Sequence, residues 1–114
     1  MNIETLFNLA LDNGASDLHL RVGLPPILRI DGRLKHREDF PLLTNIDIKQ
    51  MLDQITSQEQ RDHLSQVKEL DFSYELELKA RFRINQTGGH IFTISILDQF
   101  AEVRYNFTAP PTST

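Results

Sequence analysis

The amino-acid sequence predicts a single α+β domain with a mainly antiparallel sheet and about three helices. Its 114 residues are enough for one hydrophobic core, and a content of 39% hydrophobic and 25% charged residues is ordinary for a globular fold. Apolar residues recur at helical spacing in three stretches and alternate with polar residues in several others. Because both periodicities occur within the length of one core, we expect one globular unit.

Three short stretches combine helical spacing with residues that suit helix ends. The first begins after Asn2, which can cap a helix, and stops at Asn13-Gly14, where glycine tolerates a left-handed conformation. Capping-box patterns begin the other two, after Thr44 and after Ser57. The third helix has only a thin apolar stripe, so we expect it to be largely exposed.

Alternating stretches predict the strands of the sheet. Asp31-Gly32 is a turn pair whose residues tolerate positive φ, so the strands on either side of it should form a hairpin. We interpret the charged residues 35–39 as a solvated loop and residues 87–89 as a turn. The alternation at residues 103–107 leaves a further strand undecided, and residues 109–114 have the composition of a disordered tail. The predicted strands cover residues 17–22, 28–30, 33–34, 70–76, 80–85 and 91–97.

Composition excludes several classes of function. Without cysteine, the chain can form neither a disulfide framework nor a thiolate metal site. No apolar run approaches the roughly 18 residues of a membrane span, and the first residues lack the pattern of a secretory signal, so we expect a cytoplasmic protein without membrane insertion. A formal net charge of −4 argues against phosphate-driven binding, so we expect no nucleic-acid partner.

Two arginines separated by one residue are the sharpest chemical feature of the chain. Arg81 and Arg83 project from the same face of a predicted strand, and two guanidinium forks on one face suit the oxygens of a phosphate or carboxylate. The alternative is a surface ion pair with Asp71 or Glu75 across the hairpin, which is common and contributes little. The spacing alone favours the ion pair.

Asp17 and His19 also share a strand face, where such a pair could ligate a metal or relay a proton. Two ligands do not make a site, and no other histidine has a spacing that supplies a third, so we expect no metal site and a hydrogen-bonded structural role for His19.

Catalytic motifs are missing from the sequence as well. Gly88-Gly89 lacks the Lys and Ser or Thr of a phosphate loop, and no serine lies in a nucleophile elbow. We therefore predict no catalytic residues in this chain.

Four blocks of sequence keep the order and spacing of one known family. They are GASDLHL at 14–20, GLPPILRIDG at 23–32, LDFSY at 70–74 and ARFRIN at 80–85. Together they resemble the N-terminal domain of the type IV pilus retraction (twitching motility) ATPases, within the type II/IV secretion ATPase superfamily. The match extends from about Ile3 to Asn85.

The resemblance implies a PAS-like domain that packs on a RecA-like motor domain in a hexameric ring. In that family the small domain offers arginines to the phosphates of ATP, which the motor domain holds with Mg²⁺, and its rotation converts hydrolysis into pilus retraction. By position, Arg81 and Arg83 are the nucleotide-contact candidates here. The implied partner is a RecA-like motor domain or a hexamer of a pilus or secretion ATPase. Because the motor supplies half of each main interface, we expect the isolated chain to be a monomer or weak dimer.

The resemblance ends near residue 98. The longer family segment that follows Asn85 is reduced here to two residues, and the arginine and Ile-Pro pair expected later are missing. We therefore expect residues 1–98 to form the PAS-like N-terminal domain and residues 99–114 a divergent C-terminal extension. Because this chain shows no Walker A loop and no RecA-like motor domain, we expect it to hydrolyse no ATP and to bind no cofactor alone.

Two alternatives from other classes stay open. One is a stand-alone PAS-like regulatory or ligand-sensing module that modulates such a motor, and the other is a purely structural fragment. A sensor needs an internal cavity lined with convergent polar groups. The inward-facing strand residues look sufficient to fill the core instead, namely Leu18, Leu20, Leu28, Ile30, Phe72 and Phe82.

Overall fold

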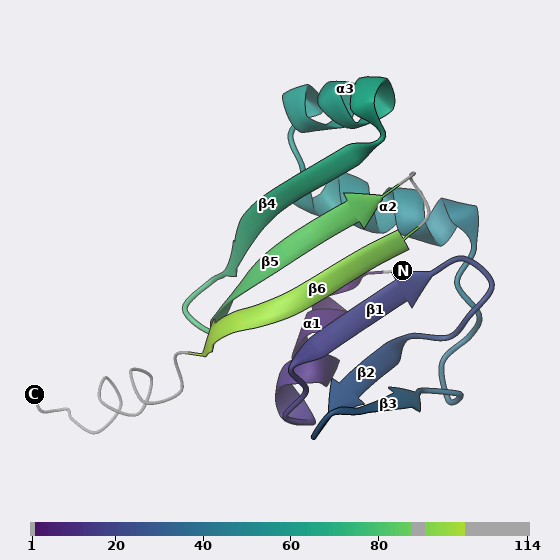
Figure 1. The fold of residues 1–114 in the computed structure, drawn as a ribbon, viewed down its shortest axis with the longest axis vertical. Helices are drawn as coiled ribbons and strands as arrows, with labels where there is room; N and C mark the ends of the chain where they lie inside the picture. The colour runs from purple at the N-terminus through teal and green to yellow at the C-terminus, as the bar shows by residue number, and fades with distance from the viewer. Residues whose placement is uncertain (1, 88–90, 100–114) are drawn as a thin grey trace, which may run out of the picture.

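A six-stranded antiparallel sheet and three helices make up the protein in a computed structural model that describes residues 2–87 and 91–99 (Figure 1). The strand order is β3-β2-β1-β6-β5-β4, so β3 and β4 form the two edges. The predicted α+β class is therefore confirmed. The elements are α1 (Ile3–Asp12), β1 (Asp17–Arg21), β2 (Ile27–Ile30), β3 (Arg33–His36), α2 (Asn45–Ile55), α3 (Gln58–Val67), β4 (Glu69–Leu76), β5 (Ala80–Thr87) and β6 (Ile91–Gln99).

The helices begin at the capping residues that the sequence indicates. The side chain of Asn2 accepts a hydrogen bond from the backbone of Glu4 and so caps α1, and a glycine with a φ of +67° follows the end of that helix at Gly14. Thr44 and Ser57 each form both hydrogen bonds of a capping box, before α2 and α3. These local bonds satisfy backbone groups that a helix start leaves unpaired.

The hairpin at Asp31-Gly32 has the predicted turn and a longer second strand than predicted. Both turn residues have positive φ, 51° and 78°, as a tight two-residue hairpin requires. The strand β3 continues through Lys35 and His36, which pair with Leu28 and Ile27. The predicted loop at 35–39 is thus wrong at its start, because backbone pairing with β2 holds these residues although all side chains of β3 are exposed.

The hydrophobic core lies between the sheet and the two helices α1 and α2, which cover the same face of it (Figure 1). Phe7 of α1 stacks on Phe82 of β5 with ring centroids 4.3 Å apart. Of the six inward-facing residues predicted to fill the core, four are fully buried, whereas Ile30 and Phe72 are partly buried and pack against it. The third helix contributes Leu64 as its buried residue and is otherwise largely exposed, as predicted.

Several predictions concern residues outside the described part of the chain. The expected turn at 88–89, the undecided strand at 103–107 and the expected disordered tail at 109–114 all lie there. The expected domain boundary at residue 98 falls within β6, which ends at Gln99. Within the described residues, no helix has the length and apolar character needed to cross a membrane.

Candidate functional site

The sheet face opposite α1 and α2, here called the open face, carries most of the polar strand residues. Side chains alternate between the two faces of a strand, so the residues between the buried positions of β1, β5 and β6 point to this side. The register aligns Arg29, Asp17, Ser95 and Arg83 across four adjacent strands. We call these four residues the polar row.

Asp17 is held at the centre of the polar row by three neighbours. Its carboxylate accepts hydrogen bonds from the hydroxyls of Ser95, at 3.0 Å, and Ser16, at 2.8 Å. Arg29 Nε lies 3.6 Å from the same carboxylate. These contacts connect β1 to β2 and β6, so Asp17 stabilises the sheet. Its carboxylate oxygens are already engaged, which leaves few lone pairs for a metal ion.

Arg83 forms the ion pair that the spacing favoured. Its Nε and Nη2 atoms donate to the two carboxylate oxygens of Asp71 on β4, at 3.2 and 2.8 Å. The side-chain hydrogen bond from Arg83 lowers the pKa of the Asp71 carboxyl and raises the pKa of the guanidinium. Because the side chains are 63% and 44% exposed, water screens the pair, and a stronger anion could displace the carboxylate.

Arg81 lies on the same side of β5 as Arg83, with the fully buried Phe82 between them pointing to the core. Its Cα pairs with that of Glu75 on β4, so a carboxylate also faces this arginine across the strand pair. The pairing of β5 with β6 shifts between Arg81 and Phe82, which is a β-bulge next to the candidate site. Both predicted site residues are therefore exposed together on the open face.

His19 does not have the predicted hydrogen-bonded environment. Its Nε2 atom is buried and has no hydrogen-bond partner in the described part of the chain. The reason is the strand register, which places Ile27 and Thr93 beside it and so offers an apolar neighbour on one side. Among the described residues, no group of three or more histidine and acidic side chains could hold a metal ion.

Gln86 was not predicted as a notable residue; it is 1% exposed, and neither of its amide atoms has a hydrogen-bond partner among the residues that the structure describes. A signal was available, because residue 86 follows Ala80, Phe82 and Ile84 in the inward-facing series of β5 and is polar where they are apolar. A polar residue at an inward position of an alternating strand indicates a buried polar group, and such a group normally has a hydrogen-bond partner.

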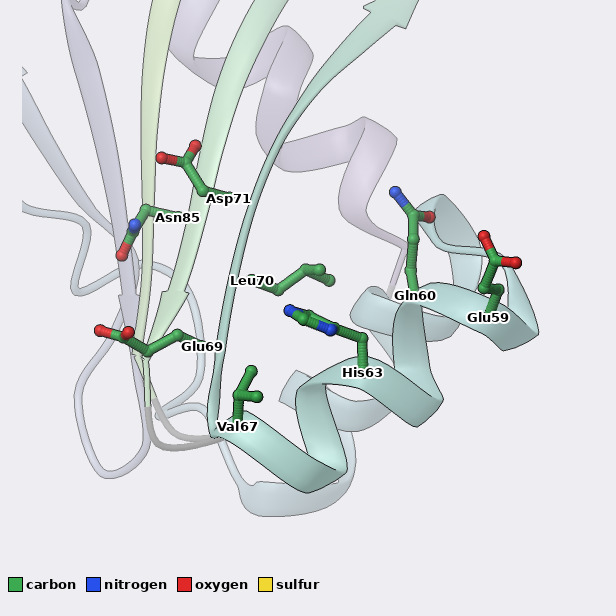
Figure 2. A pocket seen from close by; sticks show the side chains of 8 residues that line it. All are labelled: Glu59, Gln60, His63, Val67, Glu69, Leu70, Asp71 and Asn85. Carbon is green, nitrogen blue, oxygen red and sulfur yellow. The ribbon is translucent and has the colours of Figure 1, made fainter.

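A groove between α3 and β4 was also missed, because it depends on how a helix and a strand pack together. Figure 2 shows Leu70, Val67 and His63 pointing into the space between the two elements, while Glu69 and Asp71 leave β4 on its other side. The groove has a volume of about 950 Å³. Its remaining lining residues are Glu59, Gln60 and Asn85.

Comparison with known proteins places this fold in one family. The chain is 39% identical over 85 residues to the type IV pilus retraction ATPase PilT of Pseudomonas aeruginosa, a match that covers 75% of this chain and 24% of PilT. It is 28% identical to the type IV pilus ATPase PilU of the same organism, over 75% of this chain and 22% of PilU. No model of a known protein family matches the chain.

Solved structures agree with the sequence matches. The pilus retraction motor PilT, solved with bound ADP, superposes with a TM-score of 0.77 at 35% identity, over 86% of this chain and 29% of that one. The ATPase DotB of Legionella pneumophila superposes with a TM-score of 0.68, over 84% of this chain and 28% of DotB. Its 22% identity supports the fold alone.

The matches show that this chain is a domain of the type II/IV secretion ATPase superfamily. Within that superfamily it belongs with the N-terminal domain of the type IV pilus retraction ATPases, as the four sequence blocks predict. The chain spans about a quarter of the length of the curated relatives that it matches.

Proposed function

We propose that the chain is a non-catalytic module of a pilus retraction or secretion motor and acts by docking on a RecA-like motor domain in the cytoplasm. The observation that carries this proposal is the 39% identity to PilT over 85 residues, together with a shared fold at a TM-score of 0.77. The region matched is about a quarter of that ATPase, so a further part of the machine would supply the hydrolytic chemistry.

The open face is the surface that would meet bound nucleotide. Arg81 and Arg83 are exposed there on one side of a strand whose other side is anchored in the core. Negative charge spreads over the phosphate oxygens during phosphoryl transfer, and a positioned guanidinium offsets that charge. Arg83 would exchange Asp71 for a phosphate oxygen, a step that an exposed and screened ion pair permits at low cost.

The experiment joins this chain to the motor domain of P. aeruginosa PilT and measures ATP turnover. We expect Arg81→Ala and Arg83→Ala each to lower kcat at least about tenfold, because a positioned donor to the developing charge is lost. Lys49→Ala is the matched control, since that lysine is an exposed cation on α2, away from the open face, and should leave turnover unchanged. Unchanged turnover in both arginine variants would contradict the proposed role, and the chain alone should show no turnover.

The alternative of a ligand-sensing module has weaker support. The core between α1 and the sheet is filled by large buried side chains, and the stacked rings of Phe7 and Phe82 occupy its centre. Gln86 is one buried polar residue on that face, whereas a ligand cavity needs several convergent polar groups. The motor-associated module is therefore the function that we propose.

A further inference from the structure

The ion pair between Arg83 and Asp71 crosses two strands diagonally. The residue directly opposite Arg83 on β4 is Ser73, and the residue directly opposite Asp71 on β5 is Asn85. To donate to Asp71, the guanidinium of Arg83 therefore extends along the sheet toward the Asn85 end of β5. Arg81 lies on the same face of β5, on the other side of Arg83. The ion pair thus directs the Arg83 guanidinium away from Arg81.

This direction matters for an anion that both arginines bind. Alternate residues of a strand are about 6–7 Å apart, so two arginine side chains on one face can direct their guanidinium groups to a single phosphate group. That arrangement needs the Arg83 guanidinium to turn back toward Arg81, which breaks its hydrogen bonds to Asp71. The ion pair and the binding of a shared anion therefore exclude each other.

Asp71 has fewer partners than Asp17, which also faces an arginine on the open face. Asp17 accepts hydrogen bonds from two hydroxyl groups besides its contact with Arg29, and its side chain is 23% exposed. The Asp71 side chain is 44% exposed, and Arg83 is its only side-chain partner in the part of the chain that the structure describes. Of these two contacts, the pair of Asp71 and Arg83 is therefore the one that an incoming anion opens more easily.

The surroundings of Asp71 suit a carboxylate that loses its arginine. Figure 2 shows that Asp71 and Asn85, which are directly opposite each other, leave their strands on the same side. The side-chain oxygen of Asn85 accepts a hydrogen bond from Thr87, and its amide nitrogen is a donor that suits a carboxylate. A released Asp71 carboxylate keeps its contact with water and has this amide across the strand pair, so the exchange leaves no buried unpaired charge.

We propose that Asp71 is a displaceable counter-ion of Arg83, which holds the guanidinium away from Arg81 and competes with a polyphosphate that the two arginines bind together. The hydrogen bond from Arg83 lowers the pKa of the Asp71 carboxyl, so this competitor stays charged at neutral pH. Asp71 is thus a positioning residue that weakens phosphate binding and favours phosphate release. The identity of the anion, a nucleotide polyphosphate, rests on the proposed function, whereas the competition is a property of this chain alone.

The test measures how tightly the 114-residue chain binds inorganic triphosphate. Titrations at low salt follow the side-chain Nε–H signals of the arginines by NMR. We expect weak binding that shifts the signals of Arg81 and Arg83. Asp71→Asn should bind about two- to fivefold more tightly, because asparagine keeps the shape of the side chain without its charge and exposed ion pairs are weak. Arg83→Ala should bind more weakly than the wild type.

Glu69→Gln is the matched control. Figure 2 shows Glu69 on the same side of β4 as Asp71, and Glu69 forms no bond to Arg83 within residues 2–87 and 91–99. This variant removes the same charge and keeps the ion pair, so its affinity should stay near the wild-type value. The double variant Asp71→Asn/Arg83→Ala should bind like Arg83→Ala, because the carboxylate acts through that arginine.

Circular dichroism checks that every variant is folded. The proposal is overturned if Asp71→Asn binds triphosphate no more tightly than the wild type. It is also overturned if Asp71→Asn tightens binding by the same factor in the Arg83→Ala background, because the carboxylate would then act without the arginine.

The same variants joined to the PilT motor domain separate this proposal from the proposed function. Asp71→Asn should lower the KM for ATP, whereas Arg83→Ala should lower kcat. If Arg83→Ala leaves turnover unchanged while the triphosphate affinities change as expected, the proposed function fails and the competition stands. If Arg83→Ala lowers turnover while Asp71→Asn matches Glu69→Gln in both assays, the proposed function stands and Asp71 is not the counter-ion that limits phosphate binding.

Discussion

At the scale of single residues, Gln86 is the side chain whose surroundings fit it least. Its neighbours across the sheet are Leu70 on β4 and Phe92 on β6, both buried and apolar. Burial removes the amide from water, and no group within residues 2–87 and 91–99 replaces the lost hydrogen bonds. An unsatisfied buried polar group costs about 1–3 kcal/mol, so this position lowers the stability of the fold.

We predict that Gln86→Met stabilises the protein by about 1 kcal/mol, because methionine has a similar shape and carries no group that needs a hydrogen bond. Urea unfolding measures the change. Gln86→Glu is the opposite control and should destabilise strongly, since it places a carboxyl in the same apolar surroundings. A Gln86→Met variant less stable than the wild type would indicate that the amide is satisfied by ordered water.

At the scale of elements, α2 and α3 have similar capping boxes but unequal anchorage in the core. The second helix buries Ile48, Met51, Leu52 and Ile55, whereas the third buries Leu64. Helical stability in proteins comes mainly from packing of an apolar face, so α3 depends more on its local signals. Because α3 is only partly packed against the sheet, a groove remains between it and β4.

This difference predicts unequal effects of removing the two caps. Thr44→Ala should lower the free energy of global unfolding by about 1 kcal/mol, because α2 unfolds with the core. Ser57→Ala should instead speed hydrogen exchange within α3 and change global unfolding less, because a weakly anchored helix opens locally. Thr44→Ser and Ser57→Thr retain the caps as controls. Equal losses of global stability in the two alanine variants would show that α3 unfolds with the core.

Local signals and spatial arrangement explain which elements were predictable. Helix starts at Asn2, Thr44 and Ser57 depend on contacts within three residues, and the turn at Asp31-Gly32 on backbone freedom, so the sequence indicates them directly. The end of β3 depends on its pairing with β2, and the environment of His19 depends on the packing of three strands, so neither follows from local sequence. In the candidate site, the shared face of Arg81 and Arg83 was predictable from strand alternation. The groove was not predictable, because it depends on how α3 packs beside β4.

At the scale of the whole molecule, the two faces of the sheet have separate roles. The face under α1 and α2 holds the buried side chains, while the open face holds charged residues whose partners lie on neighbouring strands. Surface substitutions away from buried groups have small effects on folding. The fold should therefore tolerate changes at Arg81 and Arg83 that the proposed function does not.

We predict that Arg81→Ala and Arg83→Ala leave the midpoint of thermal unfolding of this chain close to the wild-type value. For Arg83→Ala, the pH dependence of any small loss of folding stability follows from Asp71. The hydrogen bond from Arg83 lowers the pKa of the Asp71 carboxyl in the folded state. A lowered carboxyl pKa contributes stability above the pKa of the unfolded chain, and that contribution is lost as the pH falls through the folded pKa. Any deficit of Arg83→Ala should thus be present at neutral pH and vanish in acid, as thermal unfolding across that range would show. A sharp loss of stability at neutral pH, with turnover of the joined motor unchanged, would mean that the arginine supports the fold and not the nucleotide.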